Sequence, residues 1–122
     1  MSPFVNLPGV EPHRIWGGVV GRVVPCDRMT FVLVELEPGA VVPEHSHAHE
    51  QVGVLATGSM TFRIGDETRE LGPGDAWSIP GGAPHEVRAG PAGAVAVEAF
   101  SPGRADWDAL ERGPVTPPSW PR

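Results

Sequence analysis

The sequence has a single cysteine, no long hydrophobic run and no leader-like start. Cys26 alone cannot form a disulfide within the chain. The first residues lack the basic start and apolar core of a signal peptide, so we expect the cytoplasm as the location. No apolar run approaches the ~20 residues that a membrane-spanning helix needs, which excludes a transmembrane role.

Positive charge is also scarce, because nine basic residues stand against 15 acidic ones and the formal net charge is −6. Nucleic acids and anionic membranes bind clustered positive charge, so neither is expected as a partner. All nine basic residues are arginine. This bias fits either GC-rich codon usage or the recognition of anions by the planar guanidinium group.

Glycine and proline are abundant, with 16 and 15 copies scattered between apolar runs. Such spacing predicts many short strands joined by tight turns and little helix. A chain of 122 residues is expected to form one domain, residues 1–122. We place its core at about residues 15–101, after an irregular arm over residues 1–12 and before a C-terminal helix and tail over residues 102–122. The expected helix is 104–112, and Gly113-Pro114 ends it.

Roughly nine short strands are predicted, and this number favours an all-β sandwich or barrel. Residues 29–36 are apolar on both faces, which is typical of a central strand. Residues 59–64 alternate cleanly, with Met60, Phe62 and Ile64 on one face, and Thr57-Gly58 is the predicted turn from strand 51–56. Residues 13–24 would form an exposed edge strand, so we expect a homodimer.

A row of polar side chains follows the central strand. His45, His47, His49 and Gln51 share one parity, so an extended chain places them on one face. At ~3.3 Å per residue, the first and last would lie about 20 Å apart on a straight strand. The four can therefore meet at one ion only if the chain folds back near residues 48–50. Imidazole ligands suit Zn, Ni, Fe or Cu, and His85 could join from another strand.

Two segments of the chain match the paired motifs of the cupin superfamily, and the chain is identified as resembling a small single-domain cupin. In the first motif Gln51 stands where glutamate is usual, and in the second Ala89 replaces asparagine. The resemblance implies an antiparallel double-sheet jelly-roll barrel and one divalent transition metal, either Zn, Ni, Fe or Mn. The matching positions are Gly39, His45, His47, Gln51 and Gly58, then Gly74, Pro80, Gly82 and His85.

The implied metal ligands are His45, His47, Gln51 and His85. Cupins place no ligand at the position of His49, which is then a bystander or a supporting residue, and Glu50 is the rival to Gln51. A neutral amide with three neutral imidazoles leaves the ion its full +2 charge. Such a site should be a better Lewis acid and a poorer stabiliser of higher-valent iron, which favours polarisation of a hydroxyl or carbonyl over oxygenase chemistry.

The segment 98–107 resembles an acidic-x-Phe-Ser-Pro-x-Arg-x-Asp ending found in many small cupins. Among them are the unsaturated-uronate linearising cupins of pectin and alginate breakdown. The resemblance implies that Glu98, where that family has aspartate, handles protons, that Arg104 grips the substrate carboxylate and that Phe100 lines the pocket. The alternative is a fold-closing corner held by an Arg–Asp pair.

Two further sets of side chains are open to more than one interpretation. Arg63 points either into a barrel lumen, where it would bind substrate, or into solvent. The four tryptophans are interpreted as packing residues, although one near the mouth of a pocket would suit a carbohydrate ring. These are Trp16, Trp77, Trp107 and Trp120.

Three functions follow as hypotheses. The first is a metal-dependent isomerase or tautomerase whose substrate is a small hydroxy- or keto-acid such as an unsaturated uronate. The second is an Fe-dependent dioxygenase acting on a small organic substrate. The third is a non-catalytic module that binds a metal and a ligand.

Overall fold

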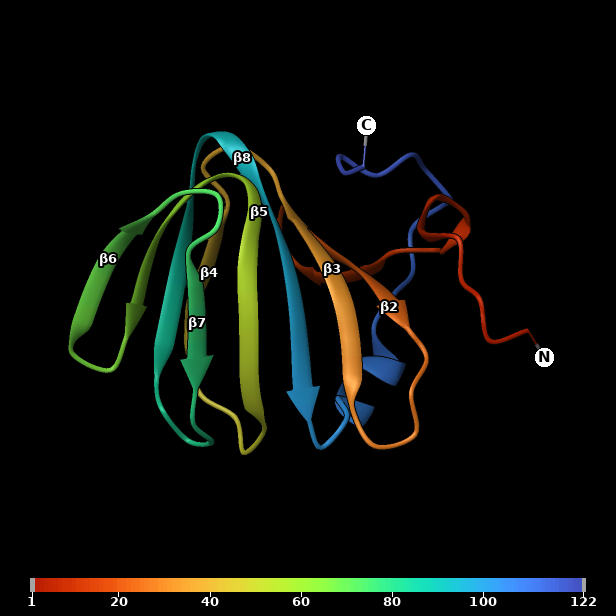
Figure 1. The fold of residues 1–122 in the computed structure, drawn as a ribbon, viewed down its shortest axis with the longest axis horizontal. Coiled ribbons are helices and arrows are strands. Elements are labelled where there is room, and N and C mark those ends of the chain that lie inside the picture. Colours follow the sequence, from red (N-terminus) through yellow and green to blue (C-terminus); the bar gives the residue numbers. More distant parts are fainter. Residues whose placement is uncertain (1, 122) are drawn as a thin grey trace.

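The computed structural model describes residues 2–121, and its regular structure consists of antiparallel strands and two short 3₁₀ helices (Figure 1). The expected all-β architecture is confirmed. No helix among the described residues is long and apolar enough to cross a membrane. The elements in chain order are η1 (Leu7–Gly9), β1 (His13–Trp16), β2 (Val19–Val24), β3 (Thr30–Leu36), β4 (Val41–His45), β5 (Glu50–Ile64), β6 (Glu67–Leu71), β7 (Ala76–Ile79), β8 (His85–Ser101) and η2 (Ala105–Ala109).

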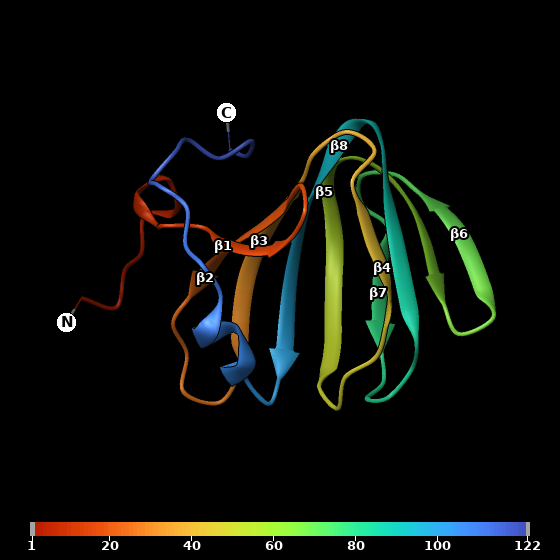
Figure 2. The same ribbon diagram turned by 180° about the vertical axis from the view of Figure 1, so that it is seen from behind.

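Strands β5 and β8 pair along their whole length and pass through both layers of the fold. Residues 50–58 of β5 pair with residues 94–101 of β8, in the layer that β3, β2 and β1 extend on one side and β7 on the other. Residues 60–64 of β5 pair with residues 85–89 of β8, between β6 and β4. β4 lies behind β7 in Figure 1 and in front of it in Figure 2, as expected for strands of facing layers.

The turn predicted at Thr57-Gly58 is wrong, because β5 continues through it. The strand instead bends at two register shifts, between Leu55 and Thr57 and between Gly58 and Met60. Such bulges increase the local twist and let one strand turn a corner between two sheets. Gly58 has a φ of 83°, and a Cβ there would lie 2.0 Å from the carbonyl oxygen of Gly93. The predicted strands 51–56 and 59–64 thus form one long strand.

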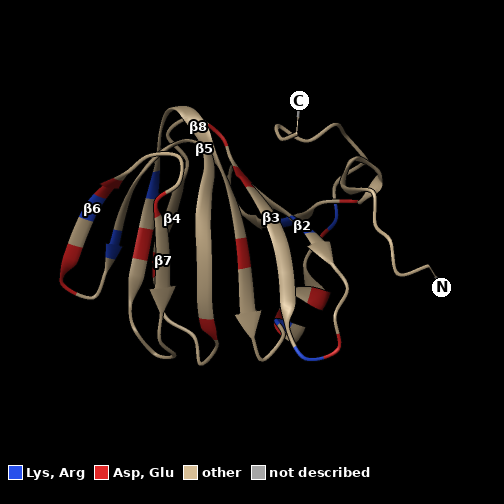
Figure 3. Ribbon diagram, in the orientation of Figure 1, with Lys and Arg blue, Asp and Glu red and all other residues tan. Residues whose placement is uncertain are grey.

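The interior contains the apolar side chains that alternate along the strands. Met60 and Phe62 of β5 are buried, as their alternation predicted. β3 lies between β2 and β8, and six of its seven residues are buried, which confirms it as a central strand. β6, at the edge, is largely exposed. Arg69 pairs there with Glu67 at 2.6 Å, and basic and acidic positions alternate along β6 (Figure 3).

The expected helix 104–112 is wrong in type and length. Only Ala105–Ala109 form a 3₁₀ helix, with no side-chain cap at its start. Leu110 already has an extended backbone, and the residues after it pair with β1. The amide of Arg14 donates to the Glu111 carbonyl at 2.9 Å, and His13 and Arg112 form a β-bridge. Strand pairing with β1 therefore ends the helix before Gly113.

A buried ion pair fastens both terminal segments to the sheet. Arg22 is 2% exposed and donates to Glu35 at 2.9 Å. The same guanidinium also donates to the carbonyl of Val10 and to the hydroxyl of Thr116, both at 3.2 Å. The amide of Ser119 donates to Glu35. The arm and the tail therefore both contact Arg22, and Figure 1 shows them on the side of the fold where β2 lies.

The corner at Gly58 yields a stability prediction. We expect Gly58→Ala to destabilise the protein by ~3 kcal/mol, because the new methyl group would overlap the Gly93 carbonyl and the positive φ would be strained. Urea unfolding followed by circular dichroism would measure the loss. Gly65→Ala is the matched control, since its φ is 59° but nothing lies within 4 Å of the added carbon. The control should lose only about 1 kcal/mol, and equal losses would contradict the overlap.

Candidate metal centre and its pocket

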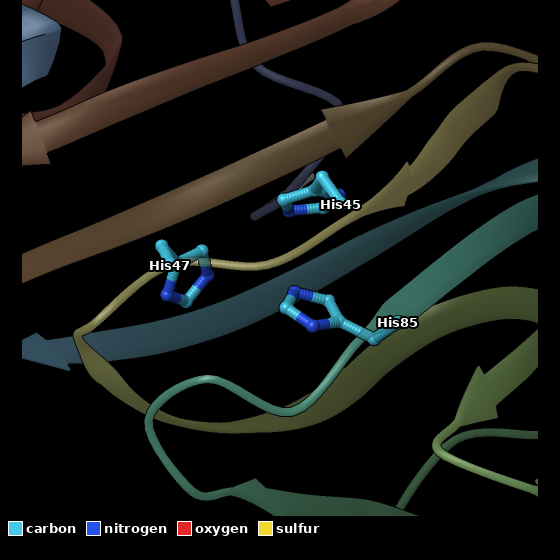
Figure 4. A group of neighbouring side chains, drawn as sticks. All are labelled: His45, His47 and His85. Atoms are coloured by element: carbon cyan, nitrogen blue, oxygen red, sulfur yellow. The ribbon is translucent and has the colours of Figure 1, made fainter.

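Three histidines from three parts of the chain meet between the layers. His45 ends β4, His85 begins β8, and the two are direct partners in the β4–β8 ladder. His47 follows in the loop that folds back into β5. One ring nitrogen of each lies within 4.8 Å of the others, and Figure 4 shows the three rings facing a common centre. The spacing of these atoms is suited to holding a metal ion.

Each of these imidazoles is oriented by a backbone carbonyl two residues before or after it. Nδ1 lies 2.8 Å from the Pro43 oxygen in His45, 3.0 Å from the His49 oxygen in His47 and 2.9 Å from the Ala83 oxygen in His85. A carbonyl only accepts, so Nδ1 carries the proton in all three. Nε2 is then left with its lone pair, which is the form that binds a metal.

The protonation state of the clustered histidines also favours the binding of a cation. Burial lowers the pKa of His85 to about 4, and burial lowers the pKa of His47 as well. Both rings are therefore neutral near pH 7. The Nε2 of His85 is buried and has no hydrogen-bond partner among the described residues. An orphaned lone pair of this kind is costly unless an ion satisfies it.

Gln51 is the first buried residue of β5, and it lies beside the histidine cluster. It is 6% exposed, whereas its neighbour Glu50 is exposed at the surface. Its Oε1 lies 3.1 Å from Nε2 of His47. Both atoms are acceptors in the tautomer described above, so a cation between them would replace repulsion by coordination. This donor set of imidazole nitrogens and an amide oxygen fits a divalent transition metal.

Glu98 lies next to Gln51 on the inward face of β8. Its Oε2 accepts hydrogen bonds from the amide nitrogen of Gln51 and, at 2.9 Å, from the indole nitrogen of Trp77. Burial raises the pKa of the Glu98 carboxyl, although both hydrogen bonds oppose that shift. The indole can reach this position because residue 53 is glycine, where a Cβ would come within 2.6 Å of the ring.

Arg104 follows β8 and also lines the pocket. Its guanidinium carbon lies 4.9 Å from the ring centre of Phe100 and 4.6 Å from that of Trp107. Nε and Nη2 bind both oxygens of Asp106, at 3.1 and 2.9 Å. Arg104 thereby lowers the pKa of the Asp106 carboxyl. Arg104 therefore forms the Arg–Asp pair and also lines the pocket. Its Nη1 has no hydrogen bond among residues 2–121.

These side chains share a pocket of about 270 Å³ between the two layers. Apolar residues form most of its wall, and the polar atoms gather at the histidine cluster and beside Arg104. The structure brings His45, Gln51, His85, Glu98, Phe100 and Arg104 together. Its lining is completed by Ile15, Trp16, Val19, Val34, Leu36, Val42, Met60, Phe62, Trp77, Val87, Ala96, Asp106, Trp107 and Leu110.

Two predicted or rival residues lie elsewhere. Arg63 is on the outer face of β5, where it pairs with Glu44 and, at 3.2 Å, with Glu86, so the structure does not bring it to this pocket. His49 packs its ring 5.4 Å from that of His47 but is not one of the three clustered histidines. Parity alone could not distinguish the inner from the outer face of residues 59–64.

Trp77 was interpreted with the other tryptophans as a packing residue, and its polar contact was not predicted. The ring does pack against Phe62, at 5.2 Å between centres. Its nitrogen, however, helps to fix Glu98. The available signal was weak: a glycine in the middle of the apolar strand 51–56 indicates that something approaches the backbone closely.

Comparison with known proteins places this geometry among cupins. The family model described as "Cupin domain" matches residues 32–99. The pectin degradation protein KdgF of Dickeya dadantii (strain 3937) is 35% identical over 97 residues, which are 78% of this chain and 88% of that protein.

Solved structures agree. KdgF from Halomonas sp. superimposes with a TM-score of 0.77 and 29% identity over 87% of this chain and 97% of its own. A RmlC-like cupin from Shewanella frigidimarina NCIMB 400 gives a TM-score of 0.81 at 24% identity, over 88% of this chain and 96% of its own, and supports the fold. The predicted cupin-type jelly roll is confirmed.

Metal analysis would test the cluster. We expect the purified protein to retain about one divalent ion per chain and His85→Ala to retain far less, because a buried ligand is lost. Elemental analysis after dialysis would measure the content. His49→Ala is the matched control, since His49 also contacts His47 but lies outside the cluster. Equal metal loss in both variants, or no ion in either variant or the parent, would contradict this site.

Proposed function

The chain belongs to the cupin family, and from this premise we propose that it is a metal-dependent isomerase that linearises a small unsaturated uronate. One observation carries the proposal: the partly buried carboxylate of Glu98 and the guanidinium of Arg104 line the same small pocket as His45 and His85 of the histidine cluster. The relative named as a pectin degradation protein supports a sugar acid as the substrate.

The proposed reaction needs no redox partner. A cyclic unsaturated uronate opens when its anomeric hydroxyl loses a proton, a carbonyl forms there and the bond from that carbon to the ring oxygen breaks. The ring oxygen stays on the double-bond carbon that carried it and becomes a second carbonyl there, and the other carbon of the former double bond gains a proton. One proton leaves and one returns, so a single acid–base group can serve both transfers.

A divalent ion held by His45, His47, Gln51 and His85 would supply a Lewis acid that polarises a substrate oxygen. The ligand atoms contribute no negative charge, so the ion's charge is not reduced by them. This feature supports polarisation over stabilisation of an oxidised metal. The remaining chemistry is assigned to side chains of the pocket.

Glu98 is proposed as the group that carries the proton. Gln51 and Trp77 both donate to its Oε2, which fixes the carboxylate, while Oε1 has no hydrogen bond among the described residues. A fixed carboxylate with one free oxygen can accept a proton and return it to another atom of a bound substrate.

Arg104 is proposed to bind the substrate carboxylate. Its Nη1 remains available after the pairing with Asp106, and the rings of Phe100 and Trp107 hold the guanidinium in place. Phe100, 3% exposed, forms the apolar wall between Arg104 and the cluster. This arrangement would orient the substrate with its carboxylate at Arg104 and its hydroxyls toward the histidines.

Replacement of the proton carrier tests the mechanism. We expect Glu98→Gln to lower kcat on an unsaturated uronate at least ~10²-fold, because the amide cannot take a proton. Metal content should stay unchanged, since the glutamine oxygen can still accept from Gln51 and Trp77. Retained turnover would contradict the role of Glu98. Oxygen uptake that requires added iron would instead identify a dioxygenase.

Replacement of Arg104 tests substrate orientation. We expect Arg104→Gln to raise KM by about tenfold or more, because a charge-assisted contact with the substrate carboxylate is lost. Arg63→Gln is the matched control, since Arg63 is also ion-paired but lies on the outer face. Steady-state kinetics would measure both, and an equal effect in the two variants would contradict the assignment.

A further inference from the structure

Trp16 lies at the mouth of the pocket. It ends β1, is 39% exposed and lines the pocket, with its ring centre 5.6 Å from that of His45 and tilted by 52°. Figure 2 shows β1 crossing in front of β3. A tryptophan that lines the pocket while more than a third of it faces solvent is available to a ligand.

The backbone positions this residue independently of its side-chain packing. The β1–β2 ladder shifts register between Arg14 and Trp16, and Gly18, with a φ of 75°, turns the chain into β2. Besides its pairing with β2, Arg14 binds Glu111 through a backbone hydrogen bond of 2.9 Å and an ion pair of 3.1 Å. A bulge that re-aims a side chain next to a site is a recurrent device.

The pocket has two chemically different walls. His45, Gln51, His85 and Glu98 contribute polar atoms, whereas Trp16 contributes a partly exposed indole ring. The volume of about 270 Å³ lies just below the ~300–1,000 Å³ usual for drug-sized ligands, so the occupant is small. A sugar ring has this same polarity, with hydroxyls at its edge and C–H groups on its face.

We propose that Trp16 is a specificity-determining residue that packs on the ring face of a monomeric uronate and selects it over an open-chain acid of equal charge. This inference rests on the proposed function and narrows its substrate class. An open-chain hydroxy acid can reach the same polar atoms and Arg104, but it has no flat apolar face to place against the indole.

Binding of two unreactive probes to the metal-loaded protein tests this inference. Galacturonate has the ring and the carboxylate, and galactonate has the carboxylate and hydroxyls without the ring. We expect calorimetry to give at least a ~10-fold preference for galacturonate in the parent protein. Trp16→Ala should weaken galacturonate binding about tenfold and change galactonate binding less than ~2-fold. The affinity of Trp16→Phe for galacturonate should lie between those of the parent and of Trp16→Ala.

Trp120→Ala is the matched control, because Trp120 is 37% exposed and does not line the pocket. It should bind both probes as the parent does. At saturating galacturonate the change in tryptophan fluorescence should be the same in Trp120→Ala as in the parent and smaller in Trp16→Ala, where Trp77 and Trp107 are the tryptophans left in the pocket. Equal losses for both probes, unchanged binding in Trp16→Ala, or no binding of galacturonate by the parent would overturn the inference.

The outcomes separate this inference from the proposed reaction. If the parent protein binds galacturonate through Trp16 but turns over no unsaturated uronate, the reaction is wrong and the ring contact stands. If turnover occurs and Trp16→Ala keeps the KM of the parent, the ring contact is wrong and the reaction stands.

Discussion

The pairing of β5 with β8 is the constraint on which the site depends. Each strand crosses from one layer to the other, so their ladder fixes both layers and the space between them. In this register Gly53 is opposite Glu98, and Ile64 is opposite His85. Glu98 thus lies near one end of the ladder, and His85 of the histidine cluster lies at the other end. A slip by one residue would turn both side chains to the outer face.

The corner that makes this pairing possible consists of backbone close contacts. Gly58 and Gly93 approach so closely that no side chain fits at Gly58, and β5 bends there without leaving the ladder. The two layers are consequently parts of the same strands. The histidine cluster between them has walls whose relative position is set by continuous hydrogen-bonded chain, which favours a preorganised site.

Local patterns in the sequence predicted the strands and the paired motifs, but not the side of the sheet on which each side chain lies. The alternation at Met60 and Phe62 predicted a shared face correctly, yet the same alternation left Arg63 open between lumen and solvent. Its partners Glu44 and Glu86 come from β4 and β8, which no local pattern reveals. The helix expected at 104–112 was wrong for a similar reason, since residues 111–112 pair with β1, about a hundred positions earlier.

Gln51 contacts both the histidine cluster and Glu98. The amide nitrogen donates to Glu98 while the amide oxygen faces His47, so one side chain connects the carboxylate to the histidine cluster. A glutamate at position 51 would bring two carboxylates into direct contact, and such a pair shares one proton. The neutral amide therefore leaves Glu98 without a second carboxylate beside it and holds it next to the cluster. The substitution that departs from the usual cupin ligand is thus matched by a carboxylate on the facing strand, and the two positions are best understood as one unit.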